Sequence, residues 1–187
     1  NPSELVRVYT KPAEGPLVDI VSYPDFLNLR DDTDVFSDAV VSSDVLLLNL
    51  VTNEGSNMVL VEYYSSNYFQ FSGLRPSLGR AFIEAEDGPV VMIGYNEWRR
   101  EYGGSPDILG QTVRLNGHPL TVVGVGPANY QGAFVGVDVQ YWVPLDTAVI
   151  LEESLREEME DRGDRSFFML ARMRPDVGIT EATAALD

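Results

Sequence analysis

Few residues of the chain have the chemistry of a catalytic group, and the first to consider is its single histidine, His118. An imidazole can act as a general base near neutral pH. His118 directly follows Asn116-Gly117, however, a pair that readily takes the positive φ angles of a two-residue hairpin turn. We therefore interpret His118 as an exposed turn residue. Because the chain has no cysteine, disulfides and thiolate zinc sites are excluded, and any nucleophile–histidine pair would have to use His118.

Acidic residues are plentiful, and they gather at Asp31, Asp32 and Asp34 and in the segment 152–164, which holds seven acidic residues against two arginines. Calcium requires about six to eight oxygen ligands, typically from a loop with a glycine at its bend, and neither cluster has that spacing. We interpret the glutamates of 152–160 as the solvated face of a helix. Paired carboxylates of a glycosidase or peptidase come from distant strands, so the sequence leaves that alternative open.

Two other patterns resemble binding motifs. Gly124-Val125-Gly126 is followed by Pro127, which does not open a helix as a dinucleotide-binding loop requires, and no Gly-Lys-Ser/Thr occurs. An aromatic cluster could line a ligand site, but core packing is its better interpretation; it consists of Tyr63, Tyr64, Tyr68, Phe69 and Phe71. The sequence thus assigns no catalytic, cofactor-binding or metal-binding residue, no cofactor and no enzyme activity.

The composition is that of a folded, acidic domain. Apolar residues make up 44% of the chain and aromatic residues 10%, enough to form a core. With 29 acidic and 13 basic residues, the formal charge of −16 argues against nucleic acid and anionic lipid as partners and predicts a monomer through self-repulsion. No apolar run approaches the length of about 18 residues that suggests a membrane helix, so we expect a water-soluble piece.

Apolar periodicity and turn signals predict irregularly alternating strands and helices, which favours an α+β fold over a doubly wound sheet. The predicted strands are 5–9, two within 36–50, 57–64, 89–93, 111–115, 119–125, 141–145 and 167–173, with a turn at 53–55. The predicted helices are 23–30 capped by Ser22, a short one capped by Ser65 or Ser66 and ended by Gly73, 95–102, one capped by Asp146 and running to Met159, and one capped by Thr180. The last helix starts near the end of the chain without a terminator, which suggests an excised fragment.

Several segments carry a resemblance when they are taken together: NPSELVRVY (1–9), VSYPDFLNLRD (21–31), YFQFSGLRPSLGRAF (68–82) with Glu86-Asp87, GYNEWRREYGGSPDILGQTVRLNGHPLTVVGVGP (94–127), YWVPL (141–145) and LARMRPDVGITEATAALD (170–187). Together they resemble the periplasmic core domain of permeases of the MacB/FtsX family of ABC transporters. Each is weak alone, but their order and spacing cover nearly the whole chain. The stretches that match least are 42–57 and 148–164.

The resemblance implies a discontinuous architecture. A porter-like βαβ subdomain is expected at 1–72 plus 165–187, with an inserted β-rich lobe at 73–164. It also implies a location on the periplasmic face of the bacterial inner membrane, within a protein that spans that membrane.

The function implied by this resemblance is mechanical. A separate cytoplasmic ATPase would drive membrane helices, and the periplasmic domains of two permease copies or halves would move together to push a substrate or signal to a periplasmic partner. The expected periplasmic partner is an adaptor protein or the cargo itself. The alternative is a signalling or scaffolding module that recruits or activates a cell-wall hydrolase or adaptor protein. An exposed apolar groove would favour cargo handling, whereas a compact convex patch would favour a protein partner.

Overall fold

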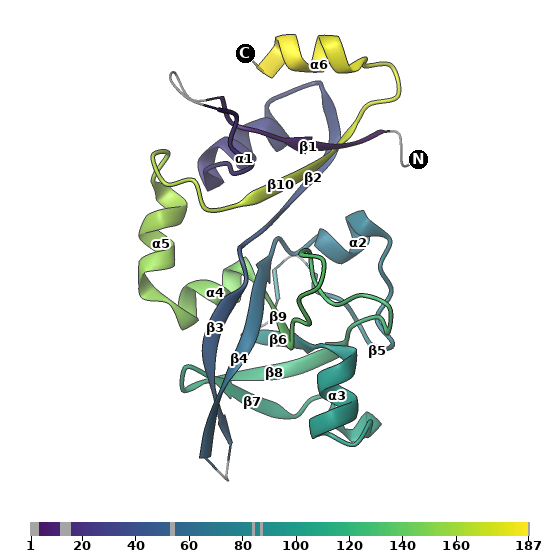
Figure 1. Cartoon of the computed structure of the whole chain (residues 1–187), viewed down its shortest axis with the longest axis vertical. Coiled ribbons are helices and arrows are strands. Elements are labelled where there is room, and N and C mark those ends of the chain that lie inside the picture. The colour runs from purple at the N-terminus through teal and green to yellow at the C-terminus, as the bar shows by residue number, and fades with distance from the viewer. Residues whose placement is uncertain (1–3, 12–15, 53–54, 84, 87, 187) are drawn as a thin grey trace. The chain divides into compact units, whose positions relative to one another are not determined.

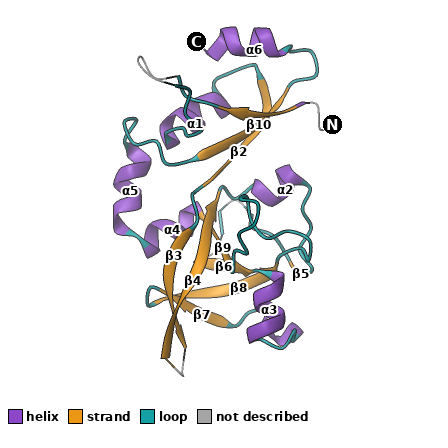
Figure 2. Ribbon diagram, viewed as in Figure 1, coloured by secondary structure: helices purple, strands orange, loops and turns teal. Residues whose placement is uncertain are grey.

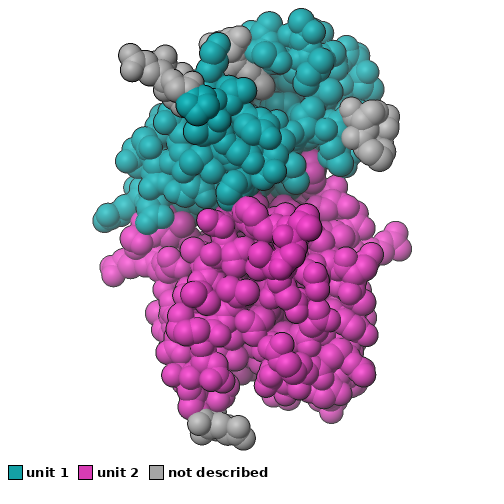
Figure 3. Space-filling view, in the orientation of Figure 1, with its two compact units in different colours: residues 1–41, 156–187 teal, residues 42–155 magenta. Residues whose placement is uncertain are grey.

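The computed structural model describes residues 4–11, 16–52, 55–83, 85–86 and 88–186. The chain divides into two compact units, coloured separately in Figure 3: unit 1 comprises residues 1–41 and 156–187, and unit 2 comprises residues 42–155. It passes from unit 1 to unit 2 within strand β2 (Phe36–Ser42) and returns within helix α5 (Glu153–Glu160). Figures 1 and 2 give the order of the elements.

Unit 1 is a split βαβ arrangement. Strand β1 (Leu5–Val8) pairs antiparallel with β10 (Phe168–Met173). On its other side β10 lies next to β2, where the Arg174 amide donates to the Val35 carbonyl and the Ser37 hydroxyl donates to the Arg172 carbonyl. Helix α1 (Tyr23–Asp31) connects β1 to β2, and α6 (Ile179–Leu186) follows β10.

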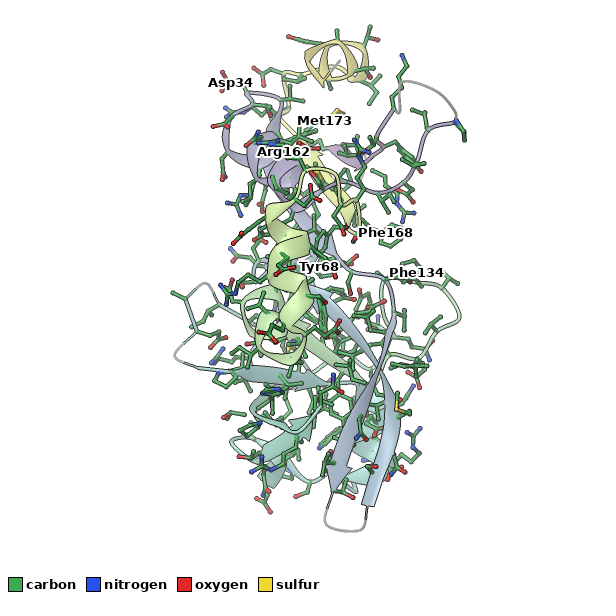
Figure 4. All side chains as sticks on the ribbon, turned by 90° about the vertical axis from the view of Figure 1, so that its left-hand side faces the viewer. Asp34, Tyr68, Phe134, Arg162, Phe168 and Met173 are labelled. Carbon is green, nitrogen blue, oxygen red and sulfur yellow. The ribbon has the colours of Figure 1, made fainter. Side chains whose placement is uncertain are left out.

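Helix α1 begins where the sequence predicts. The Ser22 hydroxyl accepts a hydrogen bond from the Asp25 amide at 3.2 Å, so Ser22 is the N-cap. Phe26 of this helix is fully buried, and Tyr23 places its ring 5.7 Å from that of Phe167. Arg162, labelled in Figure 4, pairs with Asp25 at 2.6 Å. The helix is therefore held by its cap, its aromatic face and an ion pair within unit 1.

Unit 2 is built on a six-stranded sheet that closes on itself. The strand order is β4, β3, β7, β8, β6, β9 and back to β4, with parallel pairing of β6 with β8 and of β9 with β4. The strands are β3 (Leu46–Thr52), β4 (Gly55–Tyr64), β6 (Val90–Ile93), β7 (Thr112–Leu115), β8 (His118–Val125) and β9 (Tyr141–Pro144). Alternate residues fill the interior, as at the paired Leu48 and Val59 and the paired Val113 and Leu120.

Short elements complete unit 2. They are α2 (Tyr68–Ser72), β5 (Leu78–Gly79), α3 (Tyr95–Glu101), the 3-10 helix η2 (Pro106–Ile108) and α4 (Leu145–Leu151). The predicted hairpin between β7 and β8 is confirmed, since Asn116 and Gly117 have φ angles of 48° and 82°. Gly73 ends α2 in the left-handed conformation, also as predicted. The predicted turn at 53–55 falls largely outside the described residues.

Three local predictions are wrong. The helix expected to be capped by Asp146 and to run to Met159 is two helices, α4 and α5, because the backbone of Glu152 is extended and its carboxylate accepts a hydrogen bond from Tyr63. Asp146 lies inside α4, which begins at Leu145 after Pro144 at the N-cap position. Helix α2 is capped at Asn67 rather than Ser65 or Ser66. Helix α6 begins at Ile179, so Thr180 lies inside it, and the Ala182 amide donates to the Gly178 carbonyl.

The α+β class and the discontinuous architecture with an inserted β-rich part are confirmed. The units differ from the predicted subdomain limits of 1–72 plus 165–187 and 73–164, because β3 and β4 pair with β7 and β9 and so belong to unit 2. The assignment of those limits to family subdomains stays a prediction.

The glycines of Gly124-Val125-Gly126 have a packing role. A Cβ at Gly124 would lie 2.2 Å from the Arg80 carbonyl oxygen, and one at Gly126 would lie 2.3 Å from the Trp142 ring. Strand β8 can approach β5 and the buried indole this closely only without side chains at these positions. Close packing therefore explains the pair of glycines that superficially resembles a phosphate-binding motif.

Substitution of Gly126 by alanine tests this packing. We expect Gly126→Ala to lower the free energy of unfolding by about 1–3 kcal/mol, because the new methyl group overlaps Trp142 in a filled core. Gly178→Ala is the control, since its Cβ meets nothing within 4 Å; it should change stability by no more than about 0.5 kcal/mol. Urea denaturation measures both, and equal effects would contradict the close-packing explanation.

Candidate functional site: a buried glutamate in an aromatic cluster

The most unusual group in unit 2 is the carboxylate of Glu62, in the middle of β4. Its side chain is fully buried, as are its neighbours in the strand, Val61, Tyr63 and Tyr64. Burial of a carboxylate is costly unless donors replace the lost water. Glu62 must therefore be surrounded by hydrogen-bond donors from other parts of the chain.

Among the residues that the structure describes, three donors meet the carboxylate. The hydroxyl of Tyr64, two residues further along the same face of β4, donates to it. The Ala133 amide donates at 3.1 Å, and the Trp142 indole N–H of the paired strand β9 donates at 3.3 Å. The site thus combines one neighbour in the strand with two groups that are far away in the sequence.

Burial raises the pKa of Glu62 above its ordinary value of 4.5, and the hydrogen bonds from Tyr64, Ala133 and Trp142 partly oppose this rise. The Asp44 charge adds to the rise. Burial also raises the pKa of Tyr64, and the neighbouring Glu62 charge acts in the same direction. Tyr64 consequently stays protonated and keeps its hydroxyl as a donor.

A chain of tyrosines continues from Tyr64. Its hydroxyl lies 2.8 Å from that of Tyr130, which in turn donates to Tyr68 at 3.2 Å. The rings of Tyr64 and Tyr68 stack with centroids 3.9 Å apart, and Phe69 packs edge-on against Trp142. The aromatic cluster of the sequence is therefore core packing, as predicted, and it encloses the buried carboxylate.

The network fixes the segment between β8 and β9, residues 126–140, which we call the β8–β9 loop. Near its middle, the loop is held by Ala133 on Glu62. At its end, the Gln140 amide donates to the Leu60 carbonyl, and its side chain bonds both the Leu60 amide and the buried carboxylate of Glu97. Two buried glutamates thus secure a long irregular segment to the barrel.

This arrangement holds a loop rather than performing chemistry. A general acid or base must reach a substrate, whereas Glu62 is 0% exposed and its oxygens accept from three donors. Among the described residues, no group of three or more histidine, aspartate or glutamate side chains could hold a metal ion. The arrangement therefore secures the β8–β9 loop to unit 2.

The sequence candidates lie elsewhere. His118 is the first residue of β8, paired with Leu115, and it is half-buried rather than exposed. Asp31 accepts two hydrogen bonds from Arg30, which lowers the pKa of Asp31, while Asp34 faces Arg174 at 3.5 Å. The acidic residues of 31–34 therefore do not converge on one site.

The acidic segment 152–164 is divided in its interactions. Glu152 accepts from Tyr63, whereas Glu153, Glu157 and Glu160 are exposed on α5. The solvated helix face is thus confirmed for most of these residues. Glu152 is the exception because it occupies the break between α4 and α5.

Sequence reasoning missed Glu62, although one signal was available. Glu62 is the single charged residue in the run from Gly55 to Tyr64, which otherwise reads as a buried strand. A charge inside such a run indicates either a bulge or a paired buried group. The donors could not be identified, because Ala133 and Trp142 come from a loop and a strand about 70 to 80 residues away.

Comparisons with known proteins show the family of the chain. The whole chain, residues 1–187, matches the MacB-like periplasmic core domain family. Over 129 residues it is 28% identical to the macrolide export ATP-binding/permease protein MacB of Burkholderia pseudomallei, covering 61% of this chain and 20% of that protein. A probable export ATP-binding/permease protein of Pseudomonas fluorescens is 33% identical over 87 residues, covering 45% and 13%.

Solved structures show the same fold. The periplasmic region of MacB from Actinobacillus actinomycetemcomitans aligns with a TM-score of 0.67 at 18% identity, covering 90% of this chain and 72% of that one. A domain of a putative permease from Porphyromonas gingivalis aligns with a TM-score of 0.70 at 16% identity, covering 98% and 81%. The extracellular domain of the noncanonic ABC-type transporter YknZ from Gram-positive bacteria gives 0.63 at 17% identity, covering 96% and 87%.

The fold and these matches define the class as an extracytoplasmic domain of ABC transporter permeases, on the periplasmic or extracellular side of the membrane. The chain belongs to the MacB-like periplasmic core domain family. It spans about 13–20% of the length of the curated relatives named above. No helix among the described residues has both the length and the apolar character needed to cross a bilayer.

The raised pKa of Glu62 predicts a specific pH dependence of stability. Because the folded pKa lies above that of the unfolded chain, the folded protein binds more protons between the two values. The contribution of Glu62 is thus most favourable at low pH and is lost as pH rises from about 4.5 through the folded pKa, by about 1.4 kcal/mol for each pH unit between the two values. Glu62→Gln should lack this change, which urea denaturation across pH would measure.

The matched control is Glu153→Gln, an exposed glutamate of α5. Its free energy of unfolding should stay within about 0.5 kcal/mol of that of the wild type, because substitutions at exposed positions usually change stability little. If the Glu62→Gln variant and the wild type gave parallel pH profiles, the raised pKa would be refuted. Amide hydrogen exchange at Ala133 gives a second readout, which should quicken in Glu62→Gln because the loop loses its carboxylate acceptor.

Proposed function

We propose that this chain transmits ATPase-driven movement of a permease to a substrate or partner protein outside the cytoplasm. The observation that carries the proposal is the family match over residues 1–187. The relatives named above are export ATP-binding/permease proteins. This chain would contribute movement and recognition, while ATP binding and hydrolysis take place on a cytoplasmic ATPase.

The division of the chain supports a mechanical role. Unit 1 contains both terminal segments, and unit 2 is connected to it through two crossings, in β2 and in α5. A displacement that reaches unit 1 therefore has two covalent routes into unit 2. Such coupling requires that the ATPase states favour different arrangements of these domains.

The construction of unit 2 also supports it. In the closed sheet, each strand is paired with a neighbour on both sides over at least part of its length. The Glu62 network fixes the β8–β9 loop to this sheet. A body that resists deformation passes on displacement instead of absorbing it. The partners of this function are the ATPase, reached through membrane helices, and a second permease copy or half.

A second candidate function is recruitment of an extracytoplasmic protein, such as an adaptor or a cell-wall hydrolase. The observation that favours it is the apolar surface of the β3–β4 hairpin, where Leu47 is 61% and Met58 60% exposed. This surface is a projecting ribbon, which fits a protein partner better than a small molecule. Both functions use the same domain and can coexist.

Spin-label distances test the proposed coupling. The chain has no cysteine, so Thr121→Cys in unit 2 and Asp176→Cys in unit 1 each create one labelling position in this domain. Both positions are exposed. In the full permease with its ATPase, after removal of any other reactive cysteines, we expect the distance between labels on the two copies to change between the ATP-bound and nucleotide-free states.

An ATPase variant unable to bind ATP is the control, and it should leave the distances unchanged on addition of nucleotide. Unchanged distances at both positions in the active complex would contradict the coupling role. A change at Asp176→Cys without one at Thr121→Cys would show that movement stops in unit 1.

A further inference from the structure

The hairpin of β3 and β4 has an apolar face that is directed away from the barrel interior. Its register pairs Leu47 with Leu60, Asn49 with Met58 and Val51 with Ser56, and we call these six side chains the outer face. Leu47, Val51 and Met58 are 61%, 37% and 60% exposed, whereas Leu48, Leu50 and Val59 on the opposite face are buried. Figures 1 and 4, two views at right angles, show the hairpin end projecting from the rest of unit 2.

The hairpin strands carry no charge on the residues that project. Residues 45–52 and 55–61 contain no aspartate, glutamate, lysine or arginine, in a chain that is 22% charged. Exposed strands are usually protected from pairing by charges, prolines or bulges. Residues 45–52 and 55–61 have no proline either, and the β3–β4 register is regular throughout. The hairpin therefore has the composition of a surface that becomes covered.

One backbone edge of the hairpin is also open. Leu60 directs its N–H and C=O toward Gln140, away from β3. Because backbone groups alternate along a strand, Met58 and Ser56 direct theirs the same way. Within the described ranges, the strand β9 that pairs with this side of β4 reaches only from Val61 to Tyr64, so no strand pairs with Ser56–Met58 on this side.

The net charge of the chain and the open edge of β4 together indicate which kind of molecule binds the hairpin. Lipid offers no partners to the N–H and C=O groups of an open edge, and an anionic membrane repels a chain of charge −16. A second copy would bring the same charge of −16 close to the first. An extended peptide satisfies the edge, matches the alternating apolar side chains, and is attracted if basic residues flank it.

We propose that the β4 edge at Ser56–Met58 and the outer face bind an extended segment of an extracytoplasmic protein, added to the sheet as a further strand. The segment is uncharged and apolar at alternate positions where it meets the hairpin, with lysine or arginine on either side. The inference rests on the proposed function only for the kind of partner, a protein outside the cytoplasm. Residues 42–57, one of the two stretches that match the MacB/FtsX pattern least, include all of β3 and the start of β4, in keeping with a partner particular to this chain.

A peptide-binding experiment with the 187-residue chain tests the proposal. The probe is a fluorescein-labelled peptide of about six alternating valine and threonine residues, the length of an ordinary strand, with lysines at both ends. Fluorescence anisotropy should show saturable binding that weakens as salt is raised. The same peptide with glutamates at its ends should bind more weakly, and one with a central proline should not bind, since proline lacks the ladder donor.

Two variants locate the site. Ser56→Pro removes the outward N–H of Ser56 while leaving the β3 side of the strand, and Met58→Lys places a charge on the outer face. Each should weaken binding by about tenfold, equivalent to about 1.4 kcal/mol. Thr121→Lys is the matched control for Met58→Lys, because Thr121 is an exposed residue of β8 and the change in net charge is identical; it should bind as the wild type does. Circular dichroism checks that each variant is folded.

Several outcomes would overturn the proposal. One is that the peptide with a central proline binds as tightly as the peptide without it. Another is that the folded Met58→Lys and Thr121→Lys variants bind the peptide equally. A third is that binding depends only on the charge at the ends of the peptide and not on its strand-forming centre. Dimerisation of the chain that Ser56→Pro abolishes would make the hairpin an interface between copies. Sedimentation with phosphatidylglycerol vesicles that Met58→Lys abolishes would make it a lipid contact. The peptide-binding experiment contains no ATPase, so a negative result there would not contradict the proposed coupling to the ATPase. Unchanged spin-label distances in the permease would, in turn, not contradict peptide binding by the hairpin.

Discussion

A carboxylate that is removed from water must be supplied with hydrogen-bond donors, and in unit 2 this requirement at Glu62 brings distant segments together. Tyr64 lies in the same strand, whereas Ala133 and Trp142 come from the β8–β9 loop and from β9. Satisfying Glu62 thus places β9 beside β4 and holds the loop on the barrel. The parallel pairing of β4 with β9, which closes the sheet, passes through the same residue, paired with Trp142.

Closure of the sheet explains the distribution of glycine and aromatic residues around it. Strand β8 pairs with β6, β7 and β5. Gly124 and Gly126 permit these close approaches, and the rings of Phe69, Tyr130 and Trp142 fill the space beside them. The aromatic cluster is consequently a structural feature of the barrel and not a ligand wall.

Charge separates the surface of this domain into two kinds. The chain as a whole is acidic, with 29 acidic and 13 basic residues and a formal charge of −16. The β3–β4 hairpin is instead free of charge over its strands and exposes Leu47 and Met58. The exposed apolar side chains of the hairpin therefore lie outside the barrel core, whereas Leu48 and Val59 of the same strands lie within it.

The sequence by itself determined the features that depend on neighbouring residues. Ser22 caps α1, Asn116-Gly117 turns the β7–β8 hairpin, Gly73 ends α2, and the order of the motifs identifies the family. Each of these follows from interactions within a few residues of the chain or from family resemblance.

Only the tertiary structure decided the features that depend on distant residues. The break at Glu152 requires Tyr63, 89 residues earlier, and the burial of Glu62 requires Trp142, 80 residues later. The same holds for the boundary of unit 2, which is set by the pairing of β3 with β7 and of β4 with β9. Local periodicity carries no record of which distant donor will reach a buried group, so these features emerge only when the chain has folded.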